Sequence, residues 1–455
     1  MRDLTSGPVA IHILRFASLI ALTMAFQTLY FLADLYFVGR LGPAAIAGVG
    51  LAGNLMLIVL ALTQSLGAGT TALVSQALGR RDPARAVRLF NQAIVLALIV
   101  GAAYGVVMFS LRVIYSDWLA ADRPTAVAAA RYLDWFVLAM SLQFPLVTMG
   151  AALRGVGDFK VPTIIQVATV FLNIGLAPVL IFGLGPAPAL GVAGAAIASV
   201  IAIGAGTAAL VIYFRRAGGT LRLQPRAWRP QPALWGEMLK IGLPAGGEFV
   251  LIAVYATIVY AIIQPFGAEA QAGFGIGVRV MQSLFLPAVA IGFATAPVAG
   301  QNYGARQGDR VRATFRTAGL MAALVMSVIT LVCQIAPAQL VGLFSADAGA
   351  VAFGAEYLRI ISWTFVLSGL IFVSSSMFQG LGNTLPPLAS SSLRVLLFAV
   401  PAQLIARTPG FQMRHVWYLS VASVAIQAAL TLWLLRREIA LRLPRGGALA
   451  DHPAR

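Results

Sequence analysis

Long apolar stretches separated by short polar breaks occupy almost the whole chain. A helix that crosses the hydrocarbon core of a bilayer needs about 20 apolar residues. About twelve stretches reach that length, at residues 10–38, 46–78, 87–111, 128–152, 162–183, 190–213, 236–264, 269–300, 314–336, 352–378, 386–406 and 413–435. The pattern predicts an all-α polytopic membrane protein with twelve transmembrane helices.

The longest polar break, residues 214–235, is rich in Arg, Pro and Gly and falls after the sixth predicted span. We therefore predict an N-terminal six-helix lobe at residues 1–213, a cytoplasmic linker at 214–235 and a C-terminal six-helix lobe at 236–436. The remaining residues, 437–455, are polar and predict a disordered cytoplasmic tail.

The two predicted lobes share a residue pattern at one fixed offset, 225 residues, which is the separation of Tyr30 from Tyr255. The offset holds without a gap from about residue 30 to residue 162, which indicates duplication. Each half has an even number of spans, so the halves are parallel repeats related by a pseudo-two-fold axis along the membrane normal. Two such halves suit transport by alternating access. Further matched pairs are Gly42 and Gly267, Gln76 and Gln301, Arg85 and Arg310, and Gly157 and Gly382.

Composition agrees with a membrane protein and indicates its orientation. The chain is 60% hydrophobic and 10% charged, whereas a soluble chain is about a quarter charged. The net charge of +17 could indicate nucleic acid, but the basic residues gather in alternate breaks, as the positive-inside rule expects. We predict no nucleic-acid partner. More than half of the 32 Lys and Arg residues lie on the side of both termini, which predicts cytoplasmic termini and a multi-pass protein of the inner (cytoplasmic) membrane.

The sequence offers no pattern for an enzyme, a metal site or a cofactor. Its three histidines are scattered, and its single cysteine, Cys333, lies in an apolar run. A G-x-x-x-x-G-K-[ST] phosphate loop is missing, so the chain is not expected to hydrolyse ATP. Paired acid and base residues at helical spacing do not occur within the spans. We predict a non-enzymatic monomer without cofactors.

Four stretches resemble the multidrug and toxic compound extrusion (MATE) family of xenobiotic transporters. They are residues 32–52, residues 65–86, residues 152–163 followed by 172–183 and 191–199, and residues 275–309. The last, GIGVRVMQSLFLPAVAIGFATAPVAGQNYGARQGD, is the most specific. The resemblance covers most of the chain. It implies two six-helix lobes in a V and multidrug efflux by antiport, in which small cationic or amphipathic compounds leave in exchange for protons or sodium ions.

Asp34 is a carboxylate within the first predicted span, where an isolated charge costs about 2.5–3.5 kcal/mol even on the milder insertion scale. A bound proton, sodium ion or organic cation would offset that cost. Asp34 could instead simply reach outside water, because Arg40 follows about 9 Å further along a helix. The resemblance matches Asp34 to the first-helix coupling Asp of the family, and we predict that Asp34 carries the coupling ion.

Two further residues are predicted to take part in ion coupling. Asn173 keeps the Asn of the family's N-x-x-x-D-P fifth helix, but Ala177 replaces the Asp. Glu248 lies one helical turn before the Glu position of the NorM branch, which is Ile252 here, so both positions share a face. The tenth span lacks the Asp of that branch. The resemblance is therefore nearer the DinF branch, and proton coupling is favoured over sodium coupling.

Polar, aromatic and sulfur-bearing residues within the spans are candidates to line a substrate cavity. Each could instead serve only a contact between helices. The candidates are Gln27, Tyr30, Gln64, Gln143, Gln166, Tyr255, Arg279 and Met281.

Two other function classes stay open. A lipid-linked oligosaccharide flippase of the same superfamily would hold pyrophosphate with arginines, for which Arg279 and Arg394 are the candidates within the spans. A membrane-embedded enzyme would need the acid and base pair that the sequence lacks. The repeat itself is uneven in charge, because Asp34 corresponds to Val259 and Glu248 to Thr23.

Overall fold

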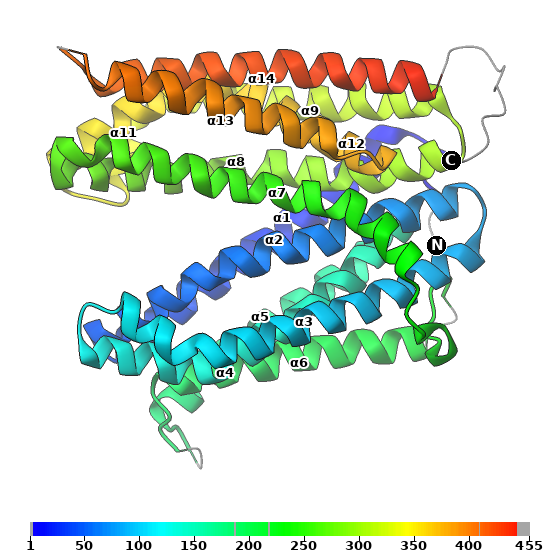
Figure 1. The fold of residues 1–455 in the computed structure, drawn as a ribbon, viewed down its shortest axis with the longest axis horizontal. Coiled ribbons are helices and arrows are strands. Elements are labelled where there is room, and N and C mark those ends of the chain that lie inside the picture. The colour runs from blue at the N-terminus through cyan, green and yellow to red at the C-terminus, as the bar shows by residue number, and fades with distance from the viewer. Residues whose placement is uncertain (1–2, 186–187, 217–218, 409, 444–455) are drawn as a thin grey trace. The chain divides into compact units, whose positions relative to one another are not determined.

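The computed structural model describes residues 3–185, 188–216, 219–408 and 410–443, and these residues form helices and connecting turns without a β-strand (Figure 1). The all-α fold expected from the sequence is confirmed. The helices of the first half are α1 (Val9–Gly39), α2 (Pro43–Gly79), α3 (Pro83–Leu119), α4 (Arg123–Val156), α5 (Lys160–Phe182) and α6 (Val192–Arg216). Those of the second half are α7 (Pro232–Ile263), α8 (Gly267–Gly304), α9 (Gly308–Ile335), α10 (Pro337–Gly342), α11 (Ala348–Ile361), α12 (Phe365–Leu381), α13 (Leu385–Ile405) and α14 (Met413–Arg442). Short 3-10 turns lie at η1 (Pro225–Trp228), η2 (Gln264–Phe266) and η3 (Ser362–Thr364).

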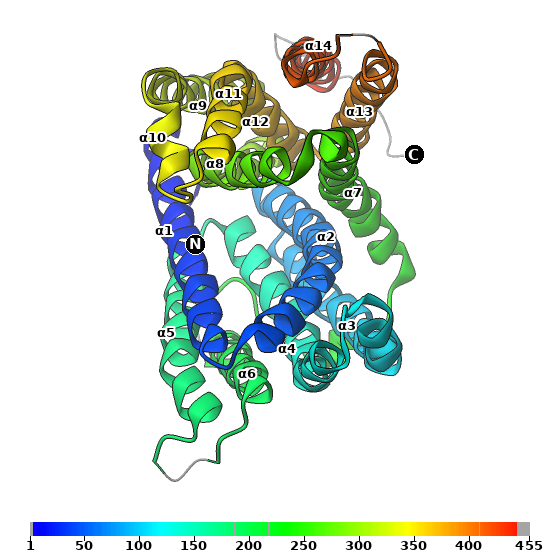
Figure 2. The same cartoon turned by 90° about the vertical axis from the view of Figure 1, so that its left-hand side faces the viewer.

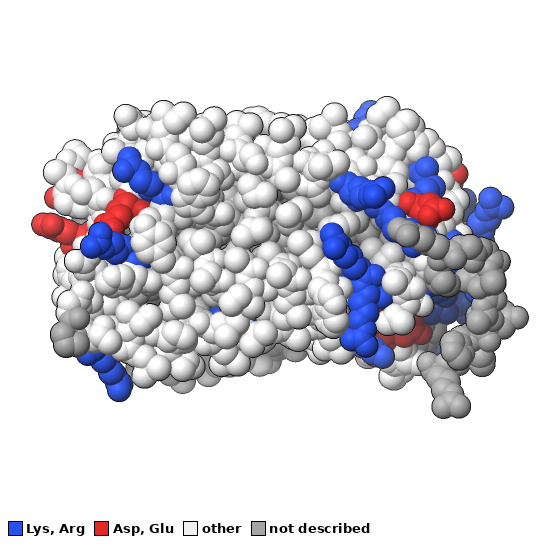
Figure 3. Space-filling view, turned by 90° about the horizontal axis from the view of Figure 1, so that it is seen from above, with Lys and Arg blue, Asp and Glu red and all other residues white. Residues whose placement is uncertain are grey.

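The helices are long and apolar enough to span a bilayer. Within the described ranges, eleven helical stretches meet that condition, and one of them, the 73-residue stretch Pro232–Gly304, contains both α7 and α8. Leu320, Leu324 and Leu331 of α9 are largely exposed at helical spacing, as expected of a face in contact with lipid. Figure 3 shows charged groups gathered toward two ends of the visible face, with a broad uncharged band between them. The protein is a multi-pass membrane protein.

The chain folds into two compact units whose boundaries differ from the predicted lobes. Unit 1 is built mainly from Leu19–Gly246, and unit 2 from Leu4–Ser18 together with the chain from Gly247 onward. The start of α1 therefore belongs to the second unit, where the Leu4 amide donates to Gln301 Oε1 at 3.1 Å. The boundaries between the units thus lie within α1 and within α7, and each of these two helices has residues in both units.

The polar breaks between spans encode helix ends. Asp82 caps the start of α3 by accepting a hydrogen bond from the Arg85 amide at 2.8 Å, and Asp122 caps α4 by accepting one from the Thr125 amide at 2.8 Å. That backbone hydrogen bond lowers the pKa of the Asp122 carboxyl below its ordinary value. Prolines occupy the first turns of α2, α3 and α4, where a missing N–H costs nothing.

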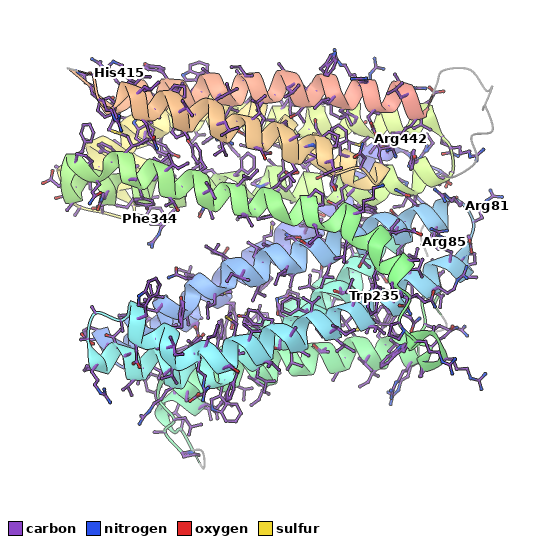
Figure 4. The ribbon with its side chains drawn as sticks, in the orientation of Figure 1. Arg81, Arg85, Trp235, Phe344, His415 and Arg442 are labelled. Atoms are coloured by element: carbon purple, nitrogen blue, oxygen red, sulfur yellow. The ribbon has the colours of Figure 1, made fainter. Side chains whose placement is uncertain are left out.

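Three unusual backbone conformations recur at the predicted offset, which confirms the internal repeat. The left-handed φ values are 107° and 87° at Gly42 and Gly267, 85° and 78° at Gly157 and Gly382, and 60° and 59° at Arg81 and Arg306. The arginine pair is stronger evidence for the repeat than the two glycine pairs, because a residue with a side chain rarely adopts a positive φ. Arg81 lies in the turn between α2 and α3 (Figure 4).

Close helix crossings also recur at equivalent positions. A Cβ placed on Gly155 of α4 would lie 3.1 Å from the Thr71 carbonyl oxygen of α2, and one on Gly380 of α12 would lie 2.6 Å from that of Ala296 in α8. Small residues at these crossings let the helix backbones approach closely. Within unit 1, α4 packs against α2, α3, α5 and α6, and α3 and α4 run side by side in both ribbon views (Figure 2).

The segment predicted as a linker is ordered along α3 where the structure describes it. Asn91 Nδ2 donates to the Arg222 carbonyl at 2.9 Å, while Asn91 Oδ1 accepts from the Gln224 amide at 2.8 Å and from Trp228 Nε1 at 3.0 Å. The neighbouring Gln92 makes three more hydrogen bonds to the same segment. Two neighbouring side chains of α3 thus replace the backbone partners that this irregular segment lacks.

An ion pair joins two helices of unit 1. Arg85 Nη2 lies 2.7 Å from Glu237 Oε2, which joins the start of α3 to the first turns of α7, near Trp235 (Figure 4). Both groups are more than a third exposed, so the pair contributes orientation rather than much stability.

Two details of the second half differ from the predicted spans. The predicted span 352–378 is divided into α11 and α12 by η3, whose Ser362 carbonyl accepts a hydrogen bond from Thr330 Oγ1 at 3.0 Å. A side chain of α9 satisfies a carbonyl that a continuous helix would have satisfied itself. In addition, α14 runs to Arg442, so residues 437–442 of the predicted tail are helical, and residues 444–455 lie outside the described residues.

Candidate functional site in the first unit

Asp34 lies in α1 and is 9% exposed, and its Oδ1 atom has no hydrogen-bond partner. A buried carboxylate oxygen without a partner is rare in folded proteins and calls for a functional explanation. Tyr30 precedes Asp34 by four residues, so the two side chains share one face of α1. The carboxyl group predicted from the sequence is thus buried in unit 1, next to a phenol.

A chain of hydrogen bonds lies on the same face of α1. Tyr30 Oη lies 2.7 Å from Ser199 Oγ of α6, and Asn173 Nδ2 of α5 donates to the same Ser199 oxygen at 3.3 Å. The Ser199 oxygen accepts from Asn173, and in the Tyr30–Ser199 pair either hydroxyl can donate to the other. Three helices therefore fix the Tyr30 phenol beside Asp34.

Ser199 is the site residue that the sequence did not single out. It ends the family-like stretch 191–199, but a small hydroxyl in an apolar helix gives no signal of its own. Both Ser199 and Asn173 are almost completely buried, at 0% and 1% exposure. Asn173 thus contacts Ser199, which in turn contacts Tyr30, and the part of Asn173 in ion coupling stays a prediction.

Local contacts hold α1 against α5 in this unit. Thr23 Oγ1 lies 3.1 Å from Thr163 Oγ1, and the Phe26 and Phe171 rings are 5.4 Å apart between centroids. Leu19 stands where the repeat has Pro244, and its carbonyl accepts a hydrogen bond from Thr23 Oγ1 at 2.9 Å. The α1 helix continues through this point without a break.

Glu248 belongs to unit 2 and has different surroundings. Its Oε2 atom accepts a hydrogen bond from Ser375 Oγ of α12 at 3.2 Å. Glu248 and Asp34 lie in separate units, and within each unit the structure does not bring a second carboxylate to either of them among the described ion pairs and hydrogen bonds.

The remaining cavity candidates are distributed over both units. Gln27 of α1 and Arg279 of α8 are exposed, whereas Gln64 of α2, Gln143 of α4 and Gln166 of α5 are half-buried. In unit 2, Met281 Sδ accepts a hydrogen bond from Tyr357 Oη at 3.5 Å, and Tyr255 Oη lies 2.8 Å from Ser420 Oγ. Their part in substrate binding stays a prediction.

Comparison with known proteins identifies the family. The MatE family profile matches residues 20–179 and 244–405, one stretch in each half of the repeat. The chain belongs to the MatE family. Its members are transporters, and this MatE protein is accordingly a membrane transporter and not an enzyme, as the sequence predicted.

The chain is similar to individual relatives over most of its length. The chain is 25% identical to the probable multidrug resistance protein YoeA of Bacillus subtilis over 90% of its own length and 89% of the relative's. It is 27% identical to the probable multidrug resistance protein NorM of Thermotoga maritima, covering 83% and 82%. Placement nearer the DinF branch than the NorM branch stays a prediction.

The fold matches that of a solved relative. The structure superposes with a TM-score of 0.89 on an outward-facing multidrug resistance MATE family transporter that is 23% identical, over 96% of this chain and 98% of that one. At this identity the likeness shows the shared fold.

Proposed function

We propose that this MatE protein exports small organic cations or amphipathic drugs in exchange for protons, by alternating access, with Asp34 as the coupling group. Its relatives YoeA and NorM are described as probable multidrug resistance proteins, which supports drug export. The single observation that carries the coupling hypothesis is the buried Asp34 carboxyl with an unpartnered Oδ1 atom.

The chemistry follows from the cost of an isolated charge in the membrane. An ionised Asp34 attracts an organic cation, and a bound proton removes both the charge and the attraction. Proton and substrate then compete for one carboxylate, so that each displaces the other. Competition for one site is the simplest way to exchange two ligands, because the protein need only alternate the side from which Asp34 is reached.

Tyr30 and Asn173 act on Asp34 by holding its surroundings in place. The hydrogen bond with Ser199 holds the Tyr30 phenol on the face of α1 that carries Asp34. An ionised carboxylate in these surroundings is costly without a positive partner, so a cation that binds must displace the proton.

Proton coupling is favoured over sodium coupling by what the second unit lacks. The position equivalent to Asp34 is Val259, and the position equivalent to Asn173 is Phe398, both fully buried. Glu248 has one hydroxyl partner, Ser375. The charge pattern further supports cytoplasmic termini and residence in the inner membrane, and nothing in the fold calls for a second copy, so we propose a monomer.

A flux assay in proteoliposomes tests the function and its driving ion. Liposomes with purified full-length protein and internal DNA would report ethidium entry under an imposed pH gradient, an imposed sodium gradient, both, or neither. We expect transport that follows the pH gradient with or without sodium. Transport that needs the sodium gradient and persists when the pH gradient is collapsed would contradict proton coupling, and its absence under every gradient would contradict drug export.

A further inference from the structure

Unit 2 contains an arginine at mid-membrane depth without a counter-ion. Arg394 is the tenth residue of the 21-residue helix α13, about 14 Å of helical rise from its start. No carboxylate of the described residues forms an ion pair with Arg394. An arginine at this depth costs about 2.5–3.5 kcal/mol even on the milder insertion scale, so an unpaired one calls for a functional explanation.

The surroundings of Arg394 hold its guanidinium by one face. The guanidinium carbon lies 4.8 Å from the centroid of the Tyr255 ring of α7, which is a cation–π contact. Tyr255 is fixed in turn by its hydrogen bond to Ser420 of α14 and by the Phe398 ring, 4.7 Å away between centroids. A guanidinium stacked by its face keeps its N–H edge available for an acceptor.

The hydrogen-bonding capacity of Arg394 is unused. Its Nε atom is buried and has no acceptor, and the side chain as a whole is only half-buried, so the terminal amino groups remain accessible. The guanidinium of Arg394 thus presents an N–H donor in need of an acceptor.

Aromatic rings lie beside the arginine. The Tyr255 ring, on which Arg394 stacks, packs against Phe398, which follows Arg394 by one helical turn of α13. Such surroundings favour a flat apolar body over an inorganic ion. Lipid phosphates lie at the membrane surface, too far from the middle of α13 to reach the guanidinium.

The repeat shows that the charge is a feature of this unit alone. The residue equivalent to Arg394 in unit 1 is Thr169, whose hydroxyl donates to the Gln166 carbonyl at 2.7 Å. The residue equivalent to Asp34 in unit 2 is Val259. Unit 1 thus carries an acid in its first helix, unit 2 carries a base in α13, and neither charge is repeated in the other unit.

We infer that unit 2 contains an anion-binding subsite in which Arg394, stacked on Tyr255, binds the carboxylate of an aromatic organic acid. The N–H edge of the guanidinium matches a carboxylate in a bidentate geometry. The ligand range of the protein would then include aromatic carboxylates in addition to cations. This inference does not depend on Asp34 or on the coupling ion.

Calorimetric titration of the full-length protein in detergent tests the subsite with a matched pair of probes. 1-Naphthoate and 1-naphthamide share the ring system and differ in charge. We expect the protein to bind the naphthoate at least about tenfold more tightly. Arg394→Gln should abolish that preference, and Arg394→Lys should keep part of it. Arg414→Gln removes an exposed arginine at the start of α14 and should leave the preference unchanged.

A labelling experiment on the wild-type protein avoids any question of whether the variant folds. Phenylglyoxal modifies accessible arginines, and mass spectrometry of digested protein reports each site. Naphthoate should slow the modification of Arg394 several-fold and leave Arg414 unaffected. Equal affinity for the two naphthalene probes, an unchanged preference in Arg394→Gln, or unchanged labelling of Arg394 would each overturn the inference. Retained naphthoate binding by Asp34→Asn would separate this result from the proposed coupling mechanism.

Discussion

The hydroxyl of Tyr30 bonds to that of Ser199 at 2.7 Å, and the pair recurs in the second unit as Tyr255 and Ser420 at 2.8 Å. In each unit the bond joins the first helix of the repeat to its last. The offset of 225 residues relates the tyrosines but would pair Ser199 with Val424. The lengths of the last two helices and of their connection differ between the halves, so only the folded structure shows that the bond is duplicated.

The Asp34 carboxyl is the first target for mutation. Asp34→Asn keeps the size of the side chain and removes the exchangeable charge, so we expect ethidium transport driven by a pH gradient to fall to the level of protein-free liposomes. Insertion, measured by the yield of monodisperse protein, should not change. Asp34→Glu should retain part of the transport, because it restores the titrating group. Transport by Asp34→Asn at the wild-type rate would remove Asp34 from the mechanism.

The Ser199 hydroxyl tests whether orientation of Tyr30 matters. Ser199→Ala leaves the Tyr30 hydroxyl and the Asn173 amide without their shared hydrogen-bond partner, at a cost of about 1–3 kcal/mol for each buried group. We expect proton-driven export about three- to tenfold slower, with a shifted pH profile of the rate. Ser110→Ala removes an exposed hydroxyl of α3 that donates only within its own helix, and serves as the control. Identical pH profiles for the two variants would argue against an orienting role.

The crossing of α12 with α8 at Gly380 predicts a large stability effect. Gly380→Leu forces side-chain atoms against the Ala296 carbonyl oxygen, which a Cβ alone would approach to 2.6 Å. Overpacking of this kind costs about 1–3 kcal/mol or more. Thermal unfolding in detergent should show a clear decrease in Tm. Gly50→Leu, on an exposed face of α2 where a Cβ meets nothing within 4 Å, should leave Tm nearly unchanged. Equal Tm values would show that the crossing is loosely packed.

The segment between α6 and α7 should become sensitive to protease when Asn91 is lost. Asn91→Leu keeps the branching and the number of side-chain heavy atoms but removes three hydrogen bonds to that segment, and leaves the Gln224 amide without its partner. Limited trypsin digestion should then cut faster after Arg222 or Arg226. The control Gln339→Leu changes an exposed amide of α10 and should keep the wild-type rate. A wild-type digestion rate for Asn91→Leu would show that Gln92 alone holds the segment.

Much of the architecture follows from local sequence. A run of apolar residues long enough to span a bilayer has few structures open to it, because every backbone N–H and C=O must be satisfied within the segment. The all-α fold and the internal repeat were therefore predictable. The turns at Gly42 and Gly157 were also predictable, because glycines recur 225 residues later at Gly267 and Gly382. The division of residues 352–378 by η3 was not, because a hydroxyl of α9 replaces a helical hydrogen bond there.

The candidate sites were only partly predictable, because contacts between helices decide part of their structure. Sequence alone determined that Asp34 and Arg394 are charged groups within apolar helices, since the cost of such charges is a property of the single helix and the membrane. Which groups surround them was decided by tertiary structure. Ser199 is a small hydroxyl with no distinguishing pattern, and it joins Tyr30 to Asn173 only because α1, α5 and α6 pack together. Arg394 of α13 contacts Tyr255 of α7, a helix far away in the chain. The inferred anion-binding subsite rests on that contact and not on the charge alone.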